Sequence, residues 1–143
     1  MSLPEPVPGL VIRYAYLWRD EALKGREEGR KDRPCVIVLA VQTVDGRSVV
    51  TVAPVTHTPP DRPEHAVEIS SATKRRLGMD VDRSWIIASD LNRFVWPGPD
   101  LRPTGPGRFA FGLLPSSLFD TLKGKVLDLA RAGRVGMTSR TSP

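Results

Sequence analysis

The sequence predicts a mainly β protein of the α+β class, a small antiparallel barrel closed by a C-terminal helix. Short runs of β-branched and aromatic residues recur along the chain, each bounded by turn-forming residues. The 143 residues include 14 prolines and 12 glycines, which argues against a bundle of long helices. One later segment has the apolar spacing of an amphipathic helix. The length is that of one domain, so we expect residues 1–143 to form a single unit.

The first half of the chain contains a predicted hairpin. We expect an extended lead-in over residues 1–8, followed by strands at 10–18, 35–44 and 47–55. Asp45-Gly46 separates the last two strands and is a strong signal for a tight turn, so these strands should pair antiparallel. Residues 19–32 are highly charged. They fit either a solvated loop with one helical turn or a mobile loop beside a site, because loops of this length are often functional.

The second half is predicted to end in a helix. Shorter strands are expected at 65–69, 84–89, 91–96 and 109–113, with one or two helical turns at 71–77 and an irregular loop at 97–108. Residues 115–132 repeat apolar side chains at helical spacing, and Gly133 is a natural stop. Ser117 and Asp120 have the spacing of a capping box. The polar residues 134–143 are expected to form a flexible tail.

Composition excludes several classes of site. A single cysteine, Cys35, rules out a disulfide within the chain, and its apolar surroundings indicate a core residue. His57 and His65 lack the ligand spacing of a zinc site, so we expect no metal. The net charge of +5 favours an anionic partner such as nucleic acid. Without an evident signal peptide or membrane-spanning stretch, the expected location is the cytoplasm.

The hairpin identifies a candidate site. Arg33 precedes one of its strands and Thr56 follows the other, so an antiparallel pairing places them as neighbours, with His57 alongside. From spacing alone, Arg33 could equally form a surface ion pair with Asp32 or Glu28, and Thr56 could be a turn-capping hydroxyl. His57 could be a general acid or base, or a structural hydrogen-bonding group.

Four segments taken in order resemble the MazF/PemK family of toxins. They begin at Pro8-Gly9 and continue through Arg33-Pro34 with its apolar strand, Ala53-Pro54-Val55-Thr56, and Ser84-Trp85-Ile86-Ile87. The resemblance covers roughly residues 8–132. It implies a small SH3-like barrel that forms a homodimer, cleaves single-stranded RNA without metal or cofactor, and is neutralised by an antitoxin. Attack by the ribose 2′-hydroxyl would leave a 2′,3′-cyclic phosphate and a 5′-hydroxyl.

The resemblance also implies roles for individual residues. Arg33 matches the family's arginine before proline and would stabilise charge on the phosphate, while Thr56 matches its threonine and would bind a phosphate oxygen. Four residues are expected to contact the substrate: Glu27 and Glu28 in the charged loop, Asn92 on a late strand, and Trp18, which is placed at a strand end to stack on a base.

Several positions depart from the family pattern. The first strand has Leu10 after Gly9 where the family has aspartate, the charged loop is longer, and His57 stands where a small polar residue is usual. The sequence therefore leaves two further functions open. One is a binding module without catalytic activity on the same barrel, resembling toxins that inhibit gyrase, and the other is an inactive relative.

Overall fold

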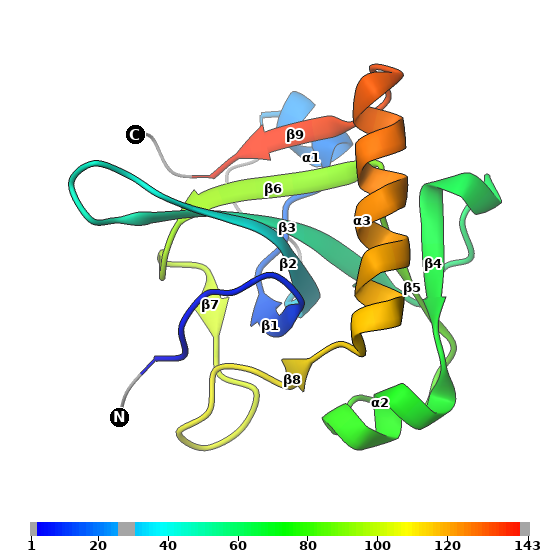
Figure 1. The fold of residues 1–143 in the computed structure, drawn as a ribbon, viewed down its shortest axis with the longest axis horizontal. Coiled ribbons are helices and arrows are strands. Elements are labelled where there is room, and N and C mark those ends of the chain that lie inside the picture. Colours follow the sequence, from blue (N-terminus) through cyan, green and yellow to red (C-terminus); the bar gives the residue numbers. More distant parts are fainter. Residues whose placement is uncertain (1–2, 26–30, 141–143) are drawn as a thin grey trace.

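In the part of the chain that the structure describes, nine strands form a mainly antiparallel sheet, and a long helix lies against it (Figure 1). The structure is a computed structural model, and it describes residues 3–25 and 31–140. The described strands are β1 (Leu10–Tyr14), β2 (Arg33–Gln42), β3 (Ser48–Thr56), β4 (Ala66–Ile69), β5 (Ser84–Ile87), β6 (Asp90–Val95), β7 (Leu101–Arg102), β8 (Gly112–Leu113) and β9 (Gly136–Ser139). The helices are α1 (Arg19–Leu23), α2 (Ser71–Leu77) and α3 (Ser116–Arg131), with a short 3₁₀ turn at Pro63–His65.

The order of the strands confirms the mainly β prediction. The main path runs β4-β5-β3-β2-β1-β7, while β6 pairs with β3 and β9, and β8 pairs with β1. Strand β3 pairs with β6 through its first half and with β5 through Val55 and Thr56, so it links the two parts of the sheet. The pairings of the described strands do not close into a ring, and the predicted barrel is therefore not confirmed.

The predicted hairpin between β2 and β3 is present. Gly46 has a φ of 86°, a conformation that glycine adopts without strain, and the Asp45 carboxylate accepts hydrogen bonds from Arg47. The register runs from Gln42 opposite Ser48 to Cys35 opposite Pro54, with an irregularity between Ile37 and Leu39. The paired residues end at Cys35 and Pro54, and continuing this register by two residues puts Arg33 opposite Thr56. Opposite residues of an antiparallel pair lie on the same face of the sheet.

The central strands are buried on both faces. Cys35 and Ile37 of β2 belong to one apolar cluster, and Val36 between them belongs to another. The first cluster also holds Tyr14 and Phe94, whose rings stack with centroids 4.4 Å apart. This double burial explains the continuous apolar runs in the sequence. It also raises the pKa of the fully buried Cys35 thiol, which agrees with a role in the core.

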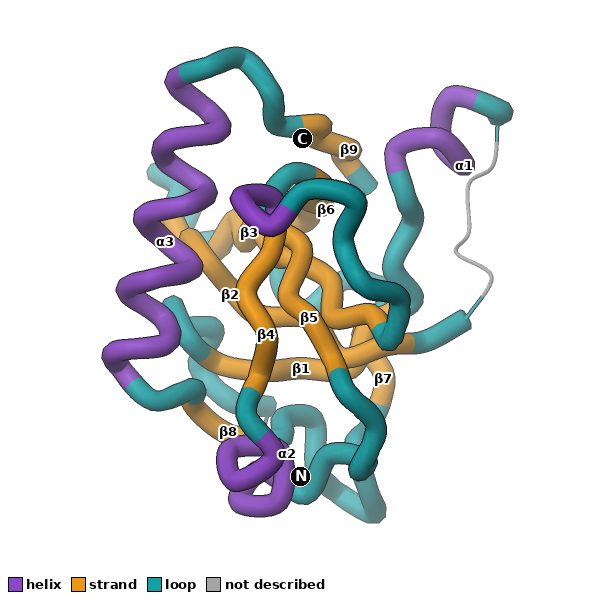
Figure 2. Tube along the Cα trace, turned by 90° about the vertical axis from the view of Figure 1, so that its right-hand side faces the viewer, coloured by secondary structure: helices purple, strands orange, loops and turns teal. Residues whose placement is uncertain are grey.

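Helix α3 confirms the predicted C-terminal helix and runs alongside the strands (Figure 2). It contributes Leu122 and Leu129 to the second cluster. The expected capping box is wrong. Pro115 occupies the N-cap position, so the helix begins one residue before Ser117 and no side chain caps it. Gly133 follows the helix with a φ of 70°, as its place in the sequence predicts. None of the helices in the described residues is long and apolar enough to cross a membrane.

The predicted flexible tail is wrong over residues 136–140. Residues Gly136–Ser139 form β9, which adds to β6 as a parallel strand. The Arg140 side chain is only 2% exposed and donates hydrogen bonds to Ala15 O and to the Asp100 carboxylate. A polar sequence is stable here because its backbone pairs with β6 and its arginine finds buried acceptors. The predicted irregular loop at 97–108 likewise contains the short strand β7.

Candidate functional site

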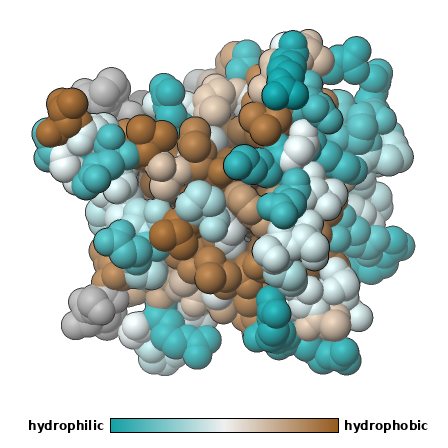
Figure 3. Space-filling view, viewed as in Figure 1, coloured by the Kyte–Doolittle hydropathy of each residue, from teal (hydrophilic) through white to brown (hydrophobic). Residues whose placement is uncertain are grey.

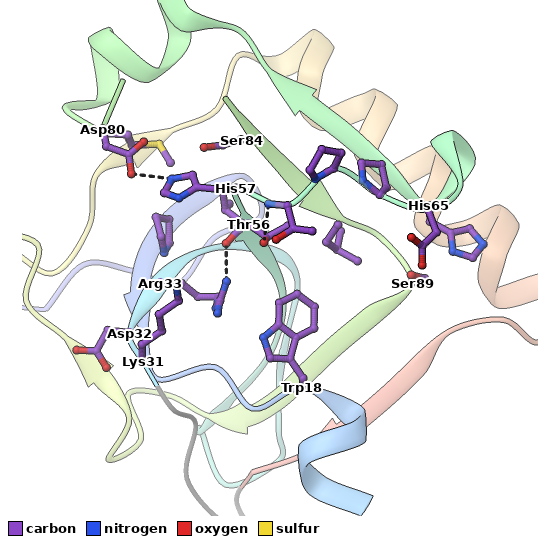
Figure 4. A pocket seen from close by; sticks show the side chains of 18 of the residues that line it. Trp18, Lys31, Asp32, Arg33, Thr56, His57, His65, Asp80, Ser84 and Ser89 are labelled. Atoms are coloured by element: carbon purple, nitrogen blue, oxygen red, sulfur yellow. Dashed lines mark hydrogen bonds and ion pairs between the residues drawn. The ribbon is translucent and has the colours of Figure 1, made fainter. Parts of the chain in front are cut away.

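A pocket of about 800 Å³ lies where the beginning of β2 meets the end of β3 (Figure 4). Three of the predicted catalytic residues line it, Arg33 from β2 together with Thr56 and His57 from the end of β3. Trp18 lies on one side of Arg33, and the segment between α2 and β5 supplies Asp80 on the other side of His57. The register of the hairpin brings the first three residues together, as the sequence predicts.

The Arg33 guanidinium is held in place but keeps unused hydrogen-bonding capacity. Its Nη1 donates to Val55 O at 3.3 Å, and its Cζ lies 5.0 Å from the centroid of the Trp18 ring. Its Nε is buried and has no hydrogen-bond partner among the described residues. The alternative of an ion pair with Asp32 is not what the structure has, because Asp32 pairs with Arg102 at 3.6 Å. Arg33 therefore presents a fixed, positively charged donor at the pocket.

Trp18 borders a second cavity as well as the pocket. Trp18 and Arg33 line both spaces, and the second cavity, of about 530 Å³, also has Tyr16 and Lys31 in its wall. The guanidinium over the Trp18 ring is a cation–π contact, which restrains both groups. Part of the predicted stacking surface is thus occupied by Arg33, and Trp18 holds the arginine as well as lining the cavities.

Thr56 combines the two alternatives that the sequence leaves open. Its Oγ1 accepts a hydrogen bond from the backbone N of Thr58 at 3.2 Å, which is the turn-capping role. The same residue lines the pocket together with Arg33. A hydroxyl that accepts from a backbone N–H still has its own hydrogen to donate, so Thr56 can bind an anionic oxygen without giving up the turn.

His57 lies within a polar chain that ends in a buried lysine. Its Nε2 is 2.9 Å from Asp80 Oδ2, and both side chains are about half exposed. The Lys74 ammonium of α2 contacts the other carboxylate oxygen, Asp80 Oδ1, at 2.5 Å, although the Lys74 side chain is only 4% exposed. Lys74 also donates to Ser84 Oγ at 2.5 Å and to Asp82 O. These partners satisfy all three ammonium hydrogens of the buried lysine.

The charges around Asp80 keep it ionised. Desolvation acts to raise the pKa of this carboxyl, but the hydrogen bonds and positive charge of Lys74 and the hydrogen bond of His57 outweigh it, and the pKa lies below its ordinary value. An ionised carboxylate can only accept hydrogen bonds, so His57 Nε2 must be the donor.

One grouping of histidine and carboxylates among the described residues is compact enough to consider as a metal site. Candidate donor atoms of His57, Asp80 and Asp82 lie within 4.8 Å of one another. The Lys74 ammonium, however, already lies on Asp80 and supplies the positive charge that a metal would bring. We therefore do not identify these residues as metal ligands.

One family model matches the part of the chain that holds the pocket. The family described as PemK-like, MazF-like toxin of type II toxin–antitoxin system matches residues 16–94, which is more than half of the chain. The chain belongs to this family. Among curated proteins, no match was found. The matched region of this PemK/MazF-family protein includes β2, β3, α2 and β5, and so contains the whole set Arg33, Thr56, His57 and Asp80.

Asn92 does not lie where a substrate contact is expected. Its side chain is fully buried on β6, accepts a hydrogen bond from Leu17 N at 3.0 Å and donates one to Leu17 O at 2.7 Å. These two bonds pair the backbone of a segment that belongs to no strand. The structure replaces the expected substrate contact with a structural role. Glu27 and Glu28 lie outside the described residues.

Sequence reasoning missed Asp80 and Lys74. A signal for Lys74 exists, because it stands three residues before Leu77 on α2 and the two positions share the buried face of that helix. Asp80 lies between the end of α2 and the start of β5, two residues before Asp82, where acidic residues are typical of a solvated turn. Only the approach of α2 to the end of β3 gives it a partner in His57.

Proposed function

We propose that this PemK/MazF-family protein is an endoribonuclease that cleaves single-stranded RNA without a metal, leaving a 2′,3′-cyclic phosphate and a 5′-hydroxyl. The observation that carries the proposal is the shared pocket of Arg33, Thr56 and His57, which a guanidinium, a hydroxyl and an imidazole line together. A cation, a neutral donor and a proton carrier are what transfer of a phosphoryl group to a neighbouring hydroxyl needs.

Arg33 stabilises the phosphate as negative charge grows on its oxygens. The Trp18 ring and Val55 O hold the guanidinium before substrate arrives, which lowers the cost of ordering it during the reaction. The N–H groups of the guanidinium that Val55 O does not take up, other than the buried Nε, are donors that a phosphate can take up.

Thr56 and His57 complete the set. The Thr56 hydroxyl donates to a second phosphate oxygen and fixes the orientation of the group. His57 removes the proton of the 2′-hydroxyl, whose oxygen then forms a bond to phosphorus. The bond from phosphorus to the 5′-oxygen breaks, and this oxygen takes up a proton from water while protonated His57 returns its own proton to water.

The substrate also needs a place for its bases. We propose that the bases on either side of the cleaved phosphate contact Trp18 and occupy the two cavities beside it. Lys31 lines both cavities and adds a further positive charge. Glu27 and Glu28 remain proposed contacts from the charged loop. The net charge of +5 supports an anionic substrate.

The family membership supports the role of a toxin whose partner is an antitoxin, acting in the cytoplasm where its RNA substrates are. We further propose a homodimer. Apolar side chains gather over the β2–β3 hairpin and the sheet beside it (Figure 3). Leu39 and Val41 alternate on β2 with about half of each side chain exposed, and Val44 at the turn is fully exposed. A second copy would remove this surface from water.

The test is cleavage of several single-stranded RNAs by the purified protein in the presence of a chelator, with the ends of the products analysed. We expect fragments that carry a cyclic phosphate, and none with an Arg33→Ala protein prepared in the same way. Absence of cleavage by the wild-type protein across RNAs of different sequence would overturn the proposal and favour a binding module without activity.

A further inference from the structure

Asp80 offers a fixed hydrogen-bond acceptor to the proposed proton carrier. Its Oδ1 accepts from Lys74 Nζ at 2.5 Å and from the backbone N of Asp82 at 3.2 Å. These two donors determine the rotation of the carboxylate and leave Oδ2 directed at His57 Nε2, 2.9 Å away. The carboxylate therefore orients the ring, and it lies on the side of His57 away from Arg33 (Figure 4).

We propose that Asp80 is a positioning residue, which holds His57 in the tautomer with hydrogen on Nε2 so that Nδ1 is the nitrogen that takes the proton of the RNA 2′-hydroxyl. The inference rests on the proposed function and deepens it. In neutral imidazole one nitrogen is a donor and the other an acceptor. Because Asp80 can only accept, Nε2 keeps its hydrogen and Nδ1 is free to act as the base.

Lys74 makes this arrangement rigid. Its side chain is 4% exposed, and the lysine is fixed between α2 and the start of β5 by Asp80, Asp82 O and Ser84. A buried ammonium of this kind cannot turn away from its partners without losing hydrogen bonds that water does not replace. The contacts of Lys74 thus fix the position of Asp80, and the hydrogen bond from His57 to Asp80 fixes the orientation of the imidazole ring.

The substitution Asp80→Asn gives a sharp test because its orientation is predictable. Both Lys74 and the backbone N of Asp82 are donors, so the asparagine oxygen must face them and its NH₂ group must face His57. An NH₂ group donates, which makes Nε2 an acceptor and moves the hydrogen to Nδ1. Nδ1 then carries a hydrogen and cannot act as the base, whereas Asp80→Ala only removes the hydrogen-bond partner of the ring. We expect Asp80→Asn to lower kcat by about 100-fold or more with little change in KM, and to be worse than Asp80→Ala.

Three further proteins control this measurement. Asp82→Asn removes the same charge from the same turn. The Asp82 carboxylate also lies within 4.8 Å of the His57 and Asp80 donor atoms, but His57 forms its hydrogen bond with Asp80. We therefore expect Asp82→Asn to keep kcat within about twofold of the wild type. Asp80→Glu restores the acceptor and should recover part of the rate. In a His57→Ala background, Asp80→Asn should cost little more, because a residue that acts through His57 has no effect without it.

A spectroscopic reading of the tautomer separates positioning from a general loss of structure. Two-bond ¹H–¹⁵N spectra distinguish the ring nitrogens of His57, and His65 serves as an internal reference. We expect hydrogen on Nε2 in the wild-type protein and on Nδ1 in Asp80→Asn. Wild-type cleavage with an undiminished rate in Asp80→Asn, or an equal loss in the His57→Ala background, would overturn the positioning role while leaving the proposed function intact. No cleavage by the wild-type protein would overturn both.

Discussion

Two groups of polar side chains lie near the ends of strands: those that line the pocket, and a buried polar cluster that contacts residues 15–19. The two groups differ in how many of their hydrogen bonds are made within the protein. The buried polar cluster consists of Tyr16, Asp90, Asn92, Asp100 and Arg140. In it the Tyr16 hydroxyl donates to Asp90 at 2.5 Å, and Arg140 donates to Asp100 at 3.0 Å. In the pocket, Arg33 Nε has no hydrogen-bond partner in the described part of the chain, and the His57 and Asp80 side chains are about half exposed.

This difference shows which polar residues stabilise the fold and which remain able to bind a ligand. Groups in the buried polar cluster have matched donors and acceptors, so removing one leaves a buried group unsatisfied and destabilises the fold. Groups in the pocket are held by some of their hydrogen bonds and keep others for a ligand. The same carboxylate chemistry responds in opposite ways, since burial raises the pKa of Asp90 while Lys74 and His57 outweigh desolvation and lower that of Asp80.

The largest expected effect is on activity, at the centre of the pocket. Arg33→Ala should lower the rate of RNA cleavage by about 100- to 1,000-fold, because it removes the charged donor for the phosphate. Single-turnover cleavage assays measure the loss, and thermal unfolding should show a melting temperature close to that of the wild type. Arg93→Ala is the matched control, since Arg93 is exposed on β6 and outside the lining of the pocket. Equal losses in both proteins would contradict the assignment.

A change in the buried polar cluster should have the reverse signature. Asn92→Ala leaves Leu17 N and Leu17 O without their partners, and we expect a loss of about 2–4 kcal/mol in the free energy of unfolding. Urea titration measures this loss, with the exposed Gln42→Ala on β2 as control, for which about 0.5 kcal/mol or less is expected. If Asn92 contacted RNA instead, KM would rise in a protein of unchanged stability.

Thr56 should give an intermediate result that joins the two behaviours. Thr56→Val keeps the shape of the side chain but removes the hydroxyl, which both caps the turn at Thr58 and is proposed to bind phosphate. We expect about a 10- to 100-fold slower cleavage together with a loss of stability of about 1 kcal/mol. Thr56→Ser retains the hydroxyl and should restore most of the rate. A rate unchanged in Thr56→Val would leave only the capping role.

The smallest expected effect is on the pH dependence of stability, and it distinguishes the two carboxylates. The folded-state pKa of Asp90 lies above its ordinary value of 3.8. Its contribution to the free energy of unfolding is therefore complete below that pH, and it is lost as the pH rises through the folded-state pKa. The folded-state pKa of Asp80 lies below 3.8, so its contribution is present above that pH and is lost as the pH falls through the lower value.

The measurement compares urea unfolding of the wild type with Asp90→Asn and Asp80→Asn between about pH 3 and pH 7. The difference in the free energy of unfolding between the wild type and Asp90→Asn should shrink or reverse as the pH rises. The corresponding difference for Asp80→Asn should shrink or reverse as the pH falls. The Asp80 effect should be the weaker, because about half of its side chain is in water, which screens the interaction. Parallel curves for all three proteins would contradict the opposite shifts.

Much of the local structure could be predicted from the sequence. The Asp45-Gly46 turn fixed the pairing of β2 with β3, and with it the neighbourhood of Arg33 and Thr56, because a tight turn leaves little choice of register. The spacing of Leu122 and Leu129 predicted α3, and Gly133 predicted its end. The capping box failed because Ser117 and Asp120 have the right spacing, but the chain enters the helix one residue earlier, at Ser116.

The sequence by itself therefore determined most of the strands, although not β7 or β9, together with the hairpin and three residues of the candidate site. Each of these depends on neighbours within a turn or along a ladder. Only the tertiary structure decided the rest. The contacts of His57 with Asp80, of Asn92 with Leu17 and of Arg140 with Asp100 join segments far apart in the chain. Such contacts depend on how the elements pack, and a polar residue has the same local signature whether packing leaves it in water, buries it with partners or places it at a pocket.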